Sequence, residues 1–580
     1  MKTVLSRALA AVVVAGLPLG VAAADVPEAL DRVPADTPVV ISIGNVNAFF
    51  DQADAIAGVL EQPEAQGGIM MARSMLSMPG INADGSAAIA ILSVENIENE
   101  EPPMVILVPV TDYNAVVTGL GGSGEGLEAL DLEGETVFVK NAGEGFAAIS
   151  PQEDTLSGFA AEGGNGDDHE DRIGETGSRM SEENAVLVIA NMEHLKEPML
   201  EGWAEGAQNM QQMMAMGGAP ADQTQAQVEM IDGFVRGFAE QADRGLMGVA
   251  GGDYGFSVEF GVNFKEGTEF ANTFAGGGNA SELMGKLPGG DYLFAYAMDF
   301  SSEGLKAAMT KLAAMNEQAG QIPGLSPAGF IENASGMAQV MGVSPGGLMG
   351  GGLLTATTAV IQTDDADALI GQFSEQMKAA NDQVVNGISM TTNFNDAGED
   401  VAGTTAHRWS MQMLPDMSQP GAMQMQMMMP MLFGPTGGPN GYIAKADAND
   451  VVVTYSTKGD MLEKAVQSAT NGGALAQDQL LKQQADRLHS DPIMLAYVDG
   501  GAIMNMVLPT IAMFAGPVNL EVPESVTPLA MSIASGGGGM SFRTVVPQDL
   551  ITLGKDTGAA FGAMGGGMGP GGGAEEPPSF

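Results

Sequence analysis

One pattern recurs along this chain of 580 residues: an apolar strand ends on Asp or Asn and runs directly into a helix. The strands are predicted from short apolar runs, and the helices from apolar residues spaced three and four apart. The strands of this first unit occupy residues 39–45, 186–191, 292–299 and 493–499. Because each copy predicts a strand followed by a helix, the pattern predicts an α+β fold.

The residue that ends each of these strands is predicted to cap the helix that follows. An Asn or Asp side chain at this position accepts a hydrogen bond from a free amide of the first helical turn, which stabilises the helix by about 0.5–2 kcal/mol. The alternative is a row of catalytic carboxylates, but Asn cannot act as a general acid or base. The predicted caps are Asn45, Asn191, Asp299 and Asp499.

Two companion units accompany the first one. The second unit is another strand followed by a helix, and the third is a strand that ends at Ser before a short helix. The second unit lies at residues 104–120, 256–274, 355–373 and 540–553, and the third at 145–156 and 451–462. The units run in the order first, second, third, first, second, and this order then repeats.

The repeated order predicts a tandem duplication with halves at residues 25–286 and 287–560. The period is much longer than that of a solenoid, so we expect two domains. Residues 408–440 are the candidate for an insertion in the second half. Each half is expected to be a mainly antiparallel sheet with helices on one face, plus Met-rich helical insertions. The alternative is that generic strands share this order by chance.

The two ends of the chain predict processing and disorder. Residues 1–24 combine Lys2 and Arg7 with an apolar run and a small-residue cleavage site, which is typical of an export signal peptide. The mature protein is therefore expected in the periplasm or outside the cell, with no transmembrane segment; an uncleaved anchor is the alternative. Residues 561–580 are rich in Gly and Pro and are predicted to be disordered.

The composition excludes several classes of function. The chain has 72 acidic and 23 basic residues, a net charge of −49, and this surface repels nucleic acid. It has no Cys, which excludes disulfides, thiolate metal sites and thiol catalysis. Nucleophile-elbow, phosphate-loop and paired-His motifs are absent. We therefore predict a protein that is not an enzyme and has no cofactor, while a hydrolase built from two convergent carboxylates stays open.

Methionine gives the most unusual chemical signal. The chain has 42 Met, clustered in three predicted helical insertions at residues 195–247, 305–342 and 411–431. Three interpretations stay open: core filler, an adaptable apolar surface for a small molecule or an envelope protein, and a Cu(I) site of thioethers. The predicted ligand or partner surface is Met213, Met214, Met425, Met427 and Met428, and the copper alternative uses Met423, Met425 and Met427. The oligomeric state is left open.

Three weaker signals complete the search. The acidic run at residues 165–171 makes Asp167 and Asp168 candidate calcium ligands, although a solvated linker is the preferred interpretation. The four His are expected at the surface or in caps. The apolar stretch 502–520 is interrupted by Pro, so it is expected to pack on the sheet or touch a membrane surface and not to span a bilayer.

The segment Val33-Pro34-Ala35-Asp36-Thr37-Pro38 leads into the first strand. It resembles the opening of a group of uncharacterised exported bacterial proteins that are classed only as a domain of unknown function. In those proteins a P-A-D-T-P segment also precedes an apolar strand and an amphipathic helix. The resemblance implies an α+β envelope protein with no established activity, and it transfers no catalytic residue.

Cleavage after Ala24 predicts that the exported protein begins at Asp25. Intact-mass measurement and N-terminal sequencing of protein recovered outside the cytoplasm should both return that start. A membrane-bound product that still carries Lys2 and Arg7 would favour the uncleaved anchor instead.

Overall fold

A computed structural model describes residues 26–565 apart from 96–101, 133, 144, 162, 217–220, 319–330, 345–346, 348–351, 386, 402, 419–421, 517 and 519. The predicted signal peptide lies outside the described residues. Residues 561–565, which were predicted to be disordered, continue the last helix; the rest of that tail also lies outside the described part.

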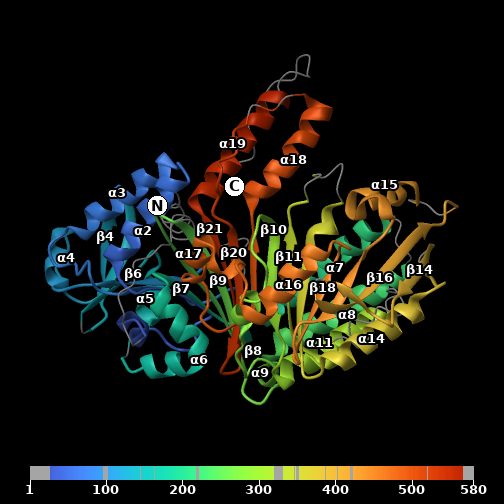
Figure 1. Cartoon of the computed structure of the whole chain (residues 1–580). Coiled ribbons are helices and arrows are strands. Elements are labelled where there is room, and N and C mark those ends of the chain that lie inside the picture. The colour runs from blue at the N-terminus through green and yellow to red at the C-terminus, as the bar shows by residue number, and fades with distance from the viewer. Residues whose placement is uncertain are drawn as a thin grey trace.

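The 21 strands of the described chain form one continuous sheet with antiparallel pairing (Figure 1). The strands of the first half, in their order across the sheet, are β4 (Glu128–Leu132), β5 (Glu135–Asn141), β6 (Phe146–Ser150), β3 (Met104–Pro109), β2 (Ala87–Ile91), β1 (Val39–Ile43), β7 (Val186–Asn191), β8 (Ala242–Gly252) and β9 (Gly255–Phe264). All the strands predicted here from the repeated units are present.

The second half has a corresponding order. Its strands, from the far edge inward, are β16 (Thr404–Pro415), β17 (Asn440–Lys445), β18 (Asp450–Thr454), β12 (Thr357–Thr363), β11 (Ala334–Gly342), β10 (Tyr292–Asp299), β19 (Pro492–Val498), β20 (Leu529–Gly536) and β21 (Gly539–Pro547). The outer edge of β16 also carries β14 (Ile388–Phe394) and β15 (Glu399–Val401), and β13 (Val384–Val385) pairs with β14. These three extra strands all precede β16 in sequence and lie outside the predicted insertion at residues 408–440.

Helices cover both faces of the sheet, so the prediction of helices on one face is wrong. Val40 packs against α6 (Gly166–Glu183) and the 3-10 helix η1 (Glu28–Arg32), whereas its neighbour Ile41 packs against α2 (Val46–Val59) on the opposite face. The same holds in the second half, where β18 is buried at every position. Central strands that are apolar on both faces need cover on both faces.

The remaining helices distribute over these two faces and the two ends of the sheet. Those of the first half are α3 (Pro63–Leu76), α4 (Tyr113–Gly119), α5 (Glu153–Gly158), α7 (Met192–Met216), α8 (Ala221–Gln241), α9 (Glu269–Thr273) and α10 (Ala280–Met284). Those of the second half are α11 (Glu303–Gln318), α14 (Ala366–Ala380), α15 (Ala422–Phe433), α16 (Gly459–Asn471), α17 (Gln479–Ala485), α18 (Gly500–Ala515) and α19 (Gln548–Gly565).

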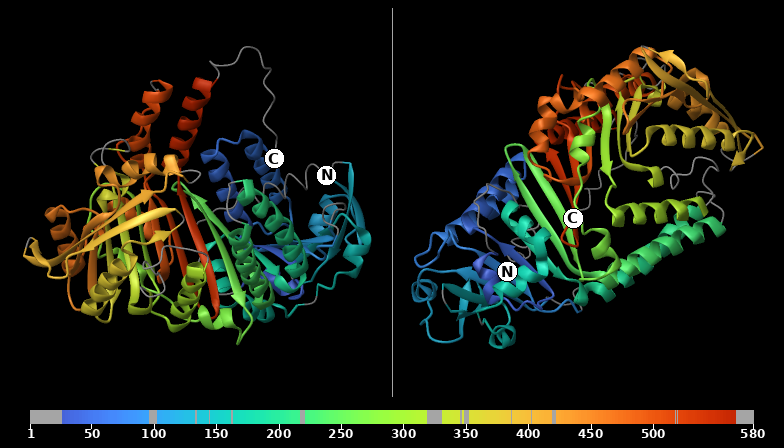
Figure 2. Two further views of the ribbon diagram at one scale, coloured as in Figure 1. Left: turned by 90° about the vertical axis from the view of Figure 1, so that its right-hand side faces the viewer. Right: turned by 60° about the horizontal axis from the view of Figure 1, so that its bottom comes forward.

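The Met-rich insertions are helical only in part. Between β7 and β8 the helices α7 and α8 form the expected hairpin, which extends beside α11 in the second half (Figure 2). However, Met337 and Met341 lie on β11, and Met411 lies on β16. Their spacing fits alternate positions of a strand, which a count of Met does not reveal.

Two of the four predicted caps are standard N-caps. The Asn45 side chain accepts a hydrogen bond from the Ala48 amide at 2.9 Å, and the Asp499 side chain accepts one from the Ala502 amide at 2.8 Å. Asn191 accepts from the Glu193 amide at the start of α7 at 3.1 Å.

Asp299 is not the cap of α11. It accepts hydrogen bonds from the amides of Ser301 and Asn279, while the hydroxyl of Ser302 accepts from Leu305 in the first turn of α11. The prediction is wrong here because the chain continues for three residues after the strand before the helix begins. A Ser then occupies the capping position.

The segment that opens the first strand is held by two arginines. The Ala35 carbonyl accepts hydrogen bonds from Arg172 of α6 at 3.0 Å and from Arg244 of β8 at 3.3 Å. Arg244 also donates to the Asn191 side chain at 3.0 Å. The P-A-D-T-P segment therefore ties η1 to the sheet.

The two halves meet at the pairing of β9 with β21, so they share one sheet and not two separate ones. At this seam Glu259 of β9 lies directly opposite Arg543 of β21. Glu259 is 1% exposed and Arg543 is 7% exposed, and the Arg543 Nε donates to Glu259 at 3.0 Å. The cross-strand ion pair is thus almost fully buried.

Residues of helix α6 join this ion pair. We call the whole group the seam cluster; its members are Glu259, Arg543, Arg179, Glu183, His489 and Ser532. Arg179 of α6 donates to Glu259 at 2.5 Å, and Arg543 donates to Glu183 of α6. His489, which precedes β19, donates from Nε2 to Glu259 at 2.9 Å and accepts from the Ser532 hydroxyl at Nδ1. Two carboxylates therefore face two guanidinium groups around a buried imidazole.

The seam cluster keeps Glu259 ionised and His489 neutral. Burial alone would raise the pKa of Glu259, but the hydrogen bond from His489 and the charges of Arg543 and Arg179 bring it well below its usual value. Burial lowers the pKa of His489, against the opposing effect of Glu259, and the two arginines lower it further. The cluster therefore carries no net charge when both arginines and both glutamates are ionised.

Replacement of Glu259 by Gln should reduce the free energy of unfolding by about 3–5 kcal/mol, because it removes the buried carboxylate that both arginines share and leaves them only the partly exposed Glu183. Chemical denaturation of the full chain measures this. The matched control is Asp51→Asn, which removes the exposed ion pair with Arg73 and should cost about 1 kcal/mol or less.

The same variant has a pH signature. Glu259 has a folded-state pKa below its ordinary value of 4.5, so its contribution is fully present above 4.5 and is lost as the pH falls below it. The stability difference between wild type and Glu259→Gln should therefore shrink in acid. Equal small losses in Glu259→Gln and Asp51→Asn at neutral pH would contradict a structural role for the seam cluster.

Candidate functional site

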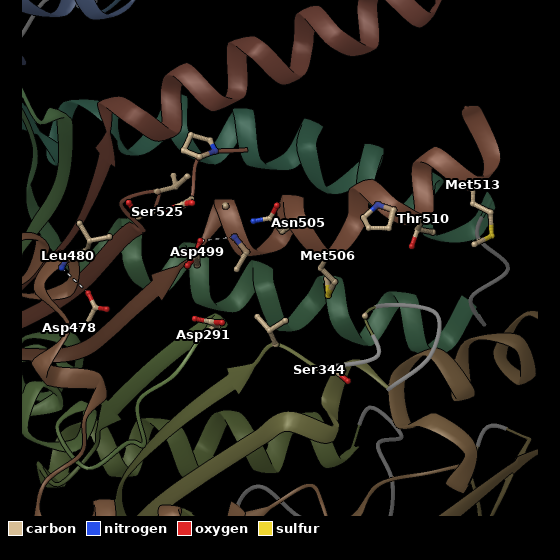
Figure 3. Close-up of a pocket in the computed structure, with 18 residues that line it drawn as sticks. Asp291, Ser344, Asp478, Leu480, Asp499, Asn505, Met506, Thr510, Met513 and Ser525 are labelled. Atoms are coloured by element: carbon tan, nitrogen blue, oxygen red, sulfur yellow. Dashed lines mark hydrogen bonds between the residues drawn. The ribbon is translucent and has the colours of Figure 1, made fainter. Parts of the chain in front are cut away.

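A cavity of about 660 Å³ opens at the ends of several central strands of the second half (Figure 3). Its floor is made by the ends of four neighbouring strands, β20, β19, β10 and β11. Because these strands are antiparallel, the end of β19 and the end of β11 lie beside the starts of β10 and β20. Loops that are far apart in the sequence therefore converge at these strand ends.

One wall of the cavity is the helix α18. Its side chains Met506, Pro509 and Met513 line the cavity, and Val526 closes the wall from the segment before β20. Pro509 lies inside the helix, where it removes one backbone hydrogen bond. The volume and apolar wall are those of a small-molecule pocket.

The helix α18 projects beyond the sheet together with α19 (Figure 1). The two helices pack closely at Gly500, where a Cβ atom would lie 2.4 Å from Leu550 of α19. At its other side α19 is tied to the first half, since Lys555 donates to the Val59 carbonyl at 2.8 Å. The apolar stretch 502–520 is thus a projecting helix as far as Ala515.

Carboxylates occupy the end of the cavity nearest the sheet. Asp291 precedes β10, Asp478 is the N-cap of α17, Asp499 is the N-cap of α18, and Glu524 lies in the loop before β20. Figure 3 shows Asp291, Asp478 and Asp499 at one end of the cavity and Met513 at the other. The cavity therefore has an acidic end and an apolar wall.

The carboxylates at the acidic end of the cavity repel one another. Burial raises the pKa of Asp499, and the negative charges of Asp291 and Asp478 raise it further, against the amide hydrogen bonds from Ala502 and Gly501. Burial, followed by the charges of Asp499 and Asp478, also raises the pKa of Tyr292. The lining residues include no Lys, Arg or His that would relieve this repulsion.

The Met residues predicted as a ligand surface lie elsewhere. Met213 of α7 is 64% exposed, and Met425, Met427 and Met428 of α15 are 38%, 65% and 47% exposed. None of them lines the cavity, and nothing is described of the Met214 side chain. The structure places the cavity Met residues on α18 instead.

The predicted copper ligands are not brought together. Met423, Met425 and Met427 lie on α15, where positions two apart point in directions that differ by roughly 200°. Met423 and Met427 share a face, but Met425 faces away from them. The M-x-M spacing converges in an extended segment and not in a helix, which argues against one site formed by all three Met residues.

The acidic run at residues 165–171 is not a linker. Asp167 and Asp168 are exposed in the first turn of α6, where negative charge interacts favourably with the helix dipole. No group of three or more His, Asp or Glu suited to a metal ion occurs in the described part of the chain.

Two of the four His are buried, which corrects their predicted surface placement. His169 is 2% exposed and bonds the Val33 carbonyl at 2.9 Å through Nε2, and His489 is 6% exposed within the seam cluster. His194 is exposed, as expected. His407 is half-buried and stacks on Phe394.

The seam cluster contains the residue types of a hydrolase triad in Ser532, His489 and Glu259. Ser532 has no exposed surface, and none of these three residues lines the cavity. Glu259 is also neutralised by two arginines, so it is not free to orient a base. The arrangement holds the seam together and offers no access to a substrate.

Sequence reasoning missed the carboxylates of the cavity because they lie in four separate loops. Asp499 was found as a cap, but its neighbour Asp291 became visible only through the pairing of β10 with β19, and Asp478 only through the placement of α17. The one signal in the sequence was the unequal pair of caps: Asn45 in the first half and Asp499 in the second do the same capping, yet only Asp499 is charged.

Comparisons with known proteins give no family for this chain. No protein-family model and no curated protein matches it. A solved structure, crystal form III of TP0453, aligns with 47% of this chain and 97% of its own length at 7% sequence identity and a TM-score of 0.23. At that TM-score the alignment carries no argument about fold or function.

Replacement of Asp499 by Asn should raise the thermal stability at neutral pH. Asn caps a helix as well as Asp does, and the change removes a half-buried charge that faces two other carboxylates. Because the folded-state pKa lies above the ordinary 3.8, the penalty is present above that raised pKa and vanishes as the pH falls toward 3.8.

Thermal melts of the full chain across this pH range test the prediction. The control is Asp112→Asn, an exposed cap of α4 whose side chain accepts from the Ala115 amide. It should change the melting temperature little at any pH. A destabilised Asp499→Asn would contradict the electrostatic strain inferred for the cavity.

Proposed function

We propose that this chain is an exported, non-enzymatic binding protein that holds an apolar small molecule in the cavity beside α18. The observation that carries the proposal is the cavity of about 660 Å³ with an apolar wall at the ends of central strands of a large sheet. Such cavities commonly bury most of a small ligand while a few polar groups orient it. The signal-peptide pattern of residues 1–24 supports an extracytoplasmic location.

The geometry supports binding more than catalysis. The cavity gathers carboxylates, the residue type of the hydrolase alternative, but its lining includes no basic residue to stabilise developing negative charge. Among the described residues, no helix is long and apolar enough to cross a membrane. Met506, Pro509 and Met513 of α18 line the cavity and are assigned to ligand contact.

Binding of an envelope protein through the exposed Met residues of α15 is the second candidate. Four of them, Met423, Met425, Met427 and Met428, are exposed on one short helix. Flexible thioether side chains suit adaptable contact with an irregular partner. The copper alternative loses support because the helix separates its proposed ligands.

The corresponding strand orders of the two halves also support a tandem duplication. In each half the strand order across the sheet begins with an outer hairpin, passes through the two strands of the first unit and ends with another hairpin. The two final hairpins pair with each other at the seam. We assign the cavity to the second half alone, since Asp291, Asp478 and Asp499 all lie there.

Titration of the full chain with decanol by calorimetry tests the proposed function. The double variant Met506→Gln and Met513→Gln should weaken binding by about tenfold or more, because each Met contributes apolar contact area. The matched control, Met423→Gln and Met427→Gln on α15, should bind as the wild type does. If the α15 variant loses binding and the α18 variant keeps it, the ligand site lies on the Met-rich insertion and the proposal is wrong.

A further inference from the structure

We infer that the ligand of this cavity is an amphiphile with a positively charged amine head, held at Asp291, Asp478 and Asp499, and an apolar chain laid along α18. This inference rests on the proposed function and adds the charge and the orientation of the ligand. It is carried by the order of the lining residues along the cavity, by their charge and by the lack of internal partners for that charge.

Asp499 lacks the cationic partner that two of the buried acidic residues have elsewhere in this chain. Asp450 is paired with Lys286 at 2.8 Å, and Glu259 is paired with Arg543 and Arg179. In the described part of the chain, no ion pair reaches Asp291, Asp478, Asp499 or Glu524. The fold thus supplies cations to Asp450 and Glu259 but none to the half-buried Asp499, whose acidic neighbours Asp291, Asp478 and Glu524 are exposed.

Capping does not account for the charge of Asp499. Asn45 makes the equivalent hydrogen bond to an amide three residues ahead, at 2.9 Å and without a charge. Asp499 makes it at 2.8 Å while its carboxylate is half-buried and faces two other carboxylates. A cation bound in the cavity would remove this repulsion, which makes positive charge the complementary feature of the ligand.

The cation is organic and not a metal ion. The described residues contain no set of three or more acidic or His side chains that could surround a metal. The rest of the cavity lining includes an apolar strip, in which Met506, Pro509 and Met513 follow one another along α18 away from the carboxylates, beside polar side chains such as Asn505 and Thr510 (Figure 3). A metal ion would leave this wall exposed to water, whereas an alkyl chain covers it.

The direction of the ligand follows from the same geometry. Asp499 caps the first turn of α18, and Met513 lies near the far end of the helix, about 20 Å away at 1.5 Å per residue. The amine head lies at the sheet, and the chain points toward the tip of the α18–α19 projection. Met513, which is 67% exposed, then contacts the end of a long chain.

Calorimetric titration with three probes of equal chain length tests this inference: decylammonium, decanol and decanoate, all below their aggregation concentrations in low-salt buffer at neutral pH. Decylammonium should bind at least about tenfold more tightly than decanol, and decanoate should bind most weakly. Added salt should reduce the preference for the amine, because the partly exposed charges are screened.

The triple variant Asp291→Asn, Asp478→Asn, Asp499→Asn should bind decylammonium only as tightly as decanol, since Asn preserves both helix caps. Asp291→Asn alone, at an exposed position without a capping role, provides the same test if the triple variant does not fold. The matched control neutralises three exposed carboxylates elsewhere, Asp54→Asn, Glu266→Gln and Asp364→Asn. It should retain the amine preference.

The outcomes separate the two proposals. Equal binding of decylammonium and decanol, with Met506 and Met513 still required, overturns the inference about charge and leaves the proposed function standing. If the control variant loses as much of the amine preference as the cavity variant does, the preference comes from the general acidity of the chain. That result also overturns the inference. Absence of binding for all three probes overturns both.

Discussion

The buried ion pair between Glu259 and Arg543 is the constraint on which the rest of the structure depends. It lies where β9 meets β21, the pairing that joins the strands of the two halves into one sheet. A buried carboxylate is tolerated only with full compensation, and here two arginines and a neutral His489 provide it. Since Arg179 and Glu183 come from α6, the same interaction fixes the position of that helix over the seam.

The seam also determines where the cavity lies. The helix α18 connects β19 to β20, and α19 follows β21, so both projecting helices emerge from strands beside the seam. With β20 and β21 held against β9, the ends of β19 and β10 converge and bring Asp499 next to Asp291. A rigid sheet thereby positions charges that its own loops do not neutralise, which is the usual relation between a scaffold and a binding site.

Much of the fold could be predicted from the sequence, because apolar runs that end at Asp, Asn or Ser mark the strands and the helices that follow them. Its limits are seen in particular residues. Asp299 was predicted to cap α11, but the helix begins only at Glu303. The M-x-M spacing of α15 predicted Met side chains on one side, which a helix does not allow. Helices were expected on one face because the central strands of each half were not recognised as buried on both sides.

The contacts between distant segments, at the seam and at the candidate site, were the least predictable part, for a physical reason. Glu259 and Arg543 occupy corresponding second units, and each alone looks like a solvent-facing position of an alternating strand. Only a pairing between residues 284 apart makes them partners. The cavity likewise joins four loops from distant segments, and the unequal caps Asn45 and Asp499 were its one local trace.

Hydrogen–deuterium exchange of the full chain with and without decylammonium tests most directly whether the ligand is held at the sheet end beside α18. The account predicts slower amide exchange in residues 500–515 and 523–526, with no change in α15 (Ala422–Phe433) or in α6 at the seam. Slower exchange in α15 or in the α7–α8 hairpin, with α18 unaffected, would contradict it.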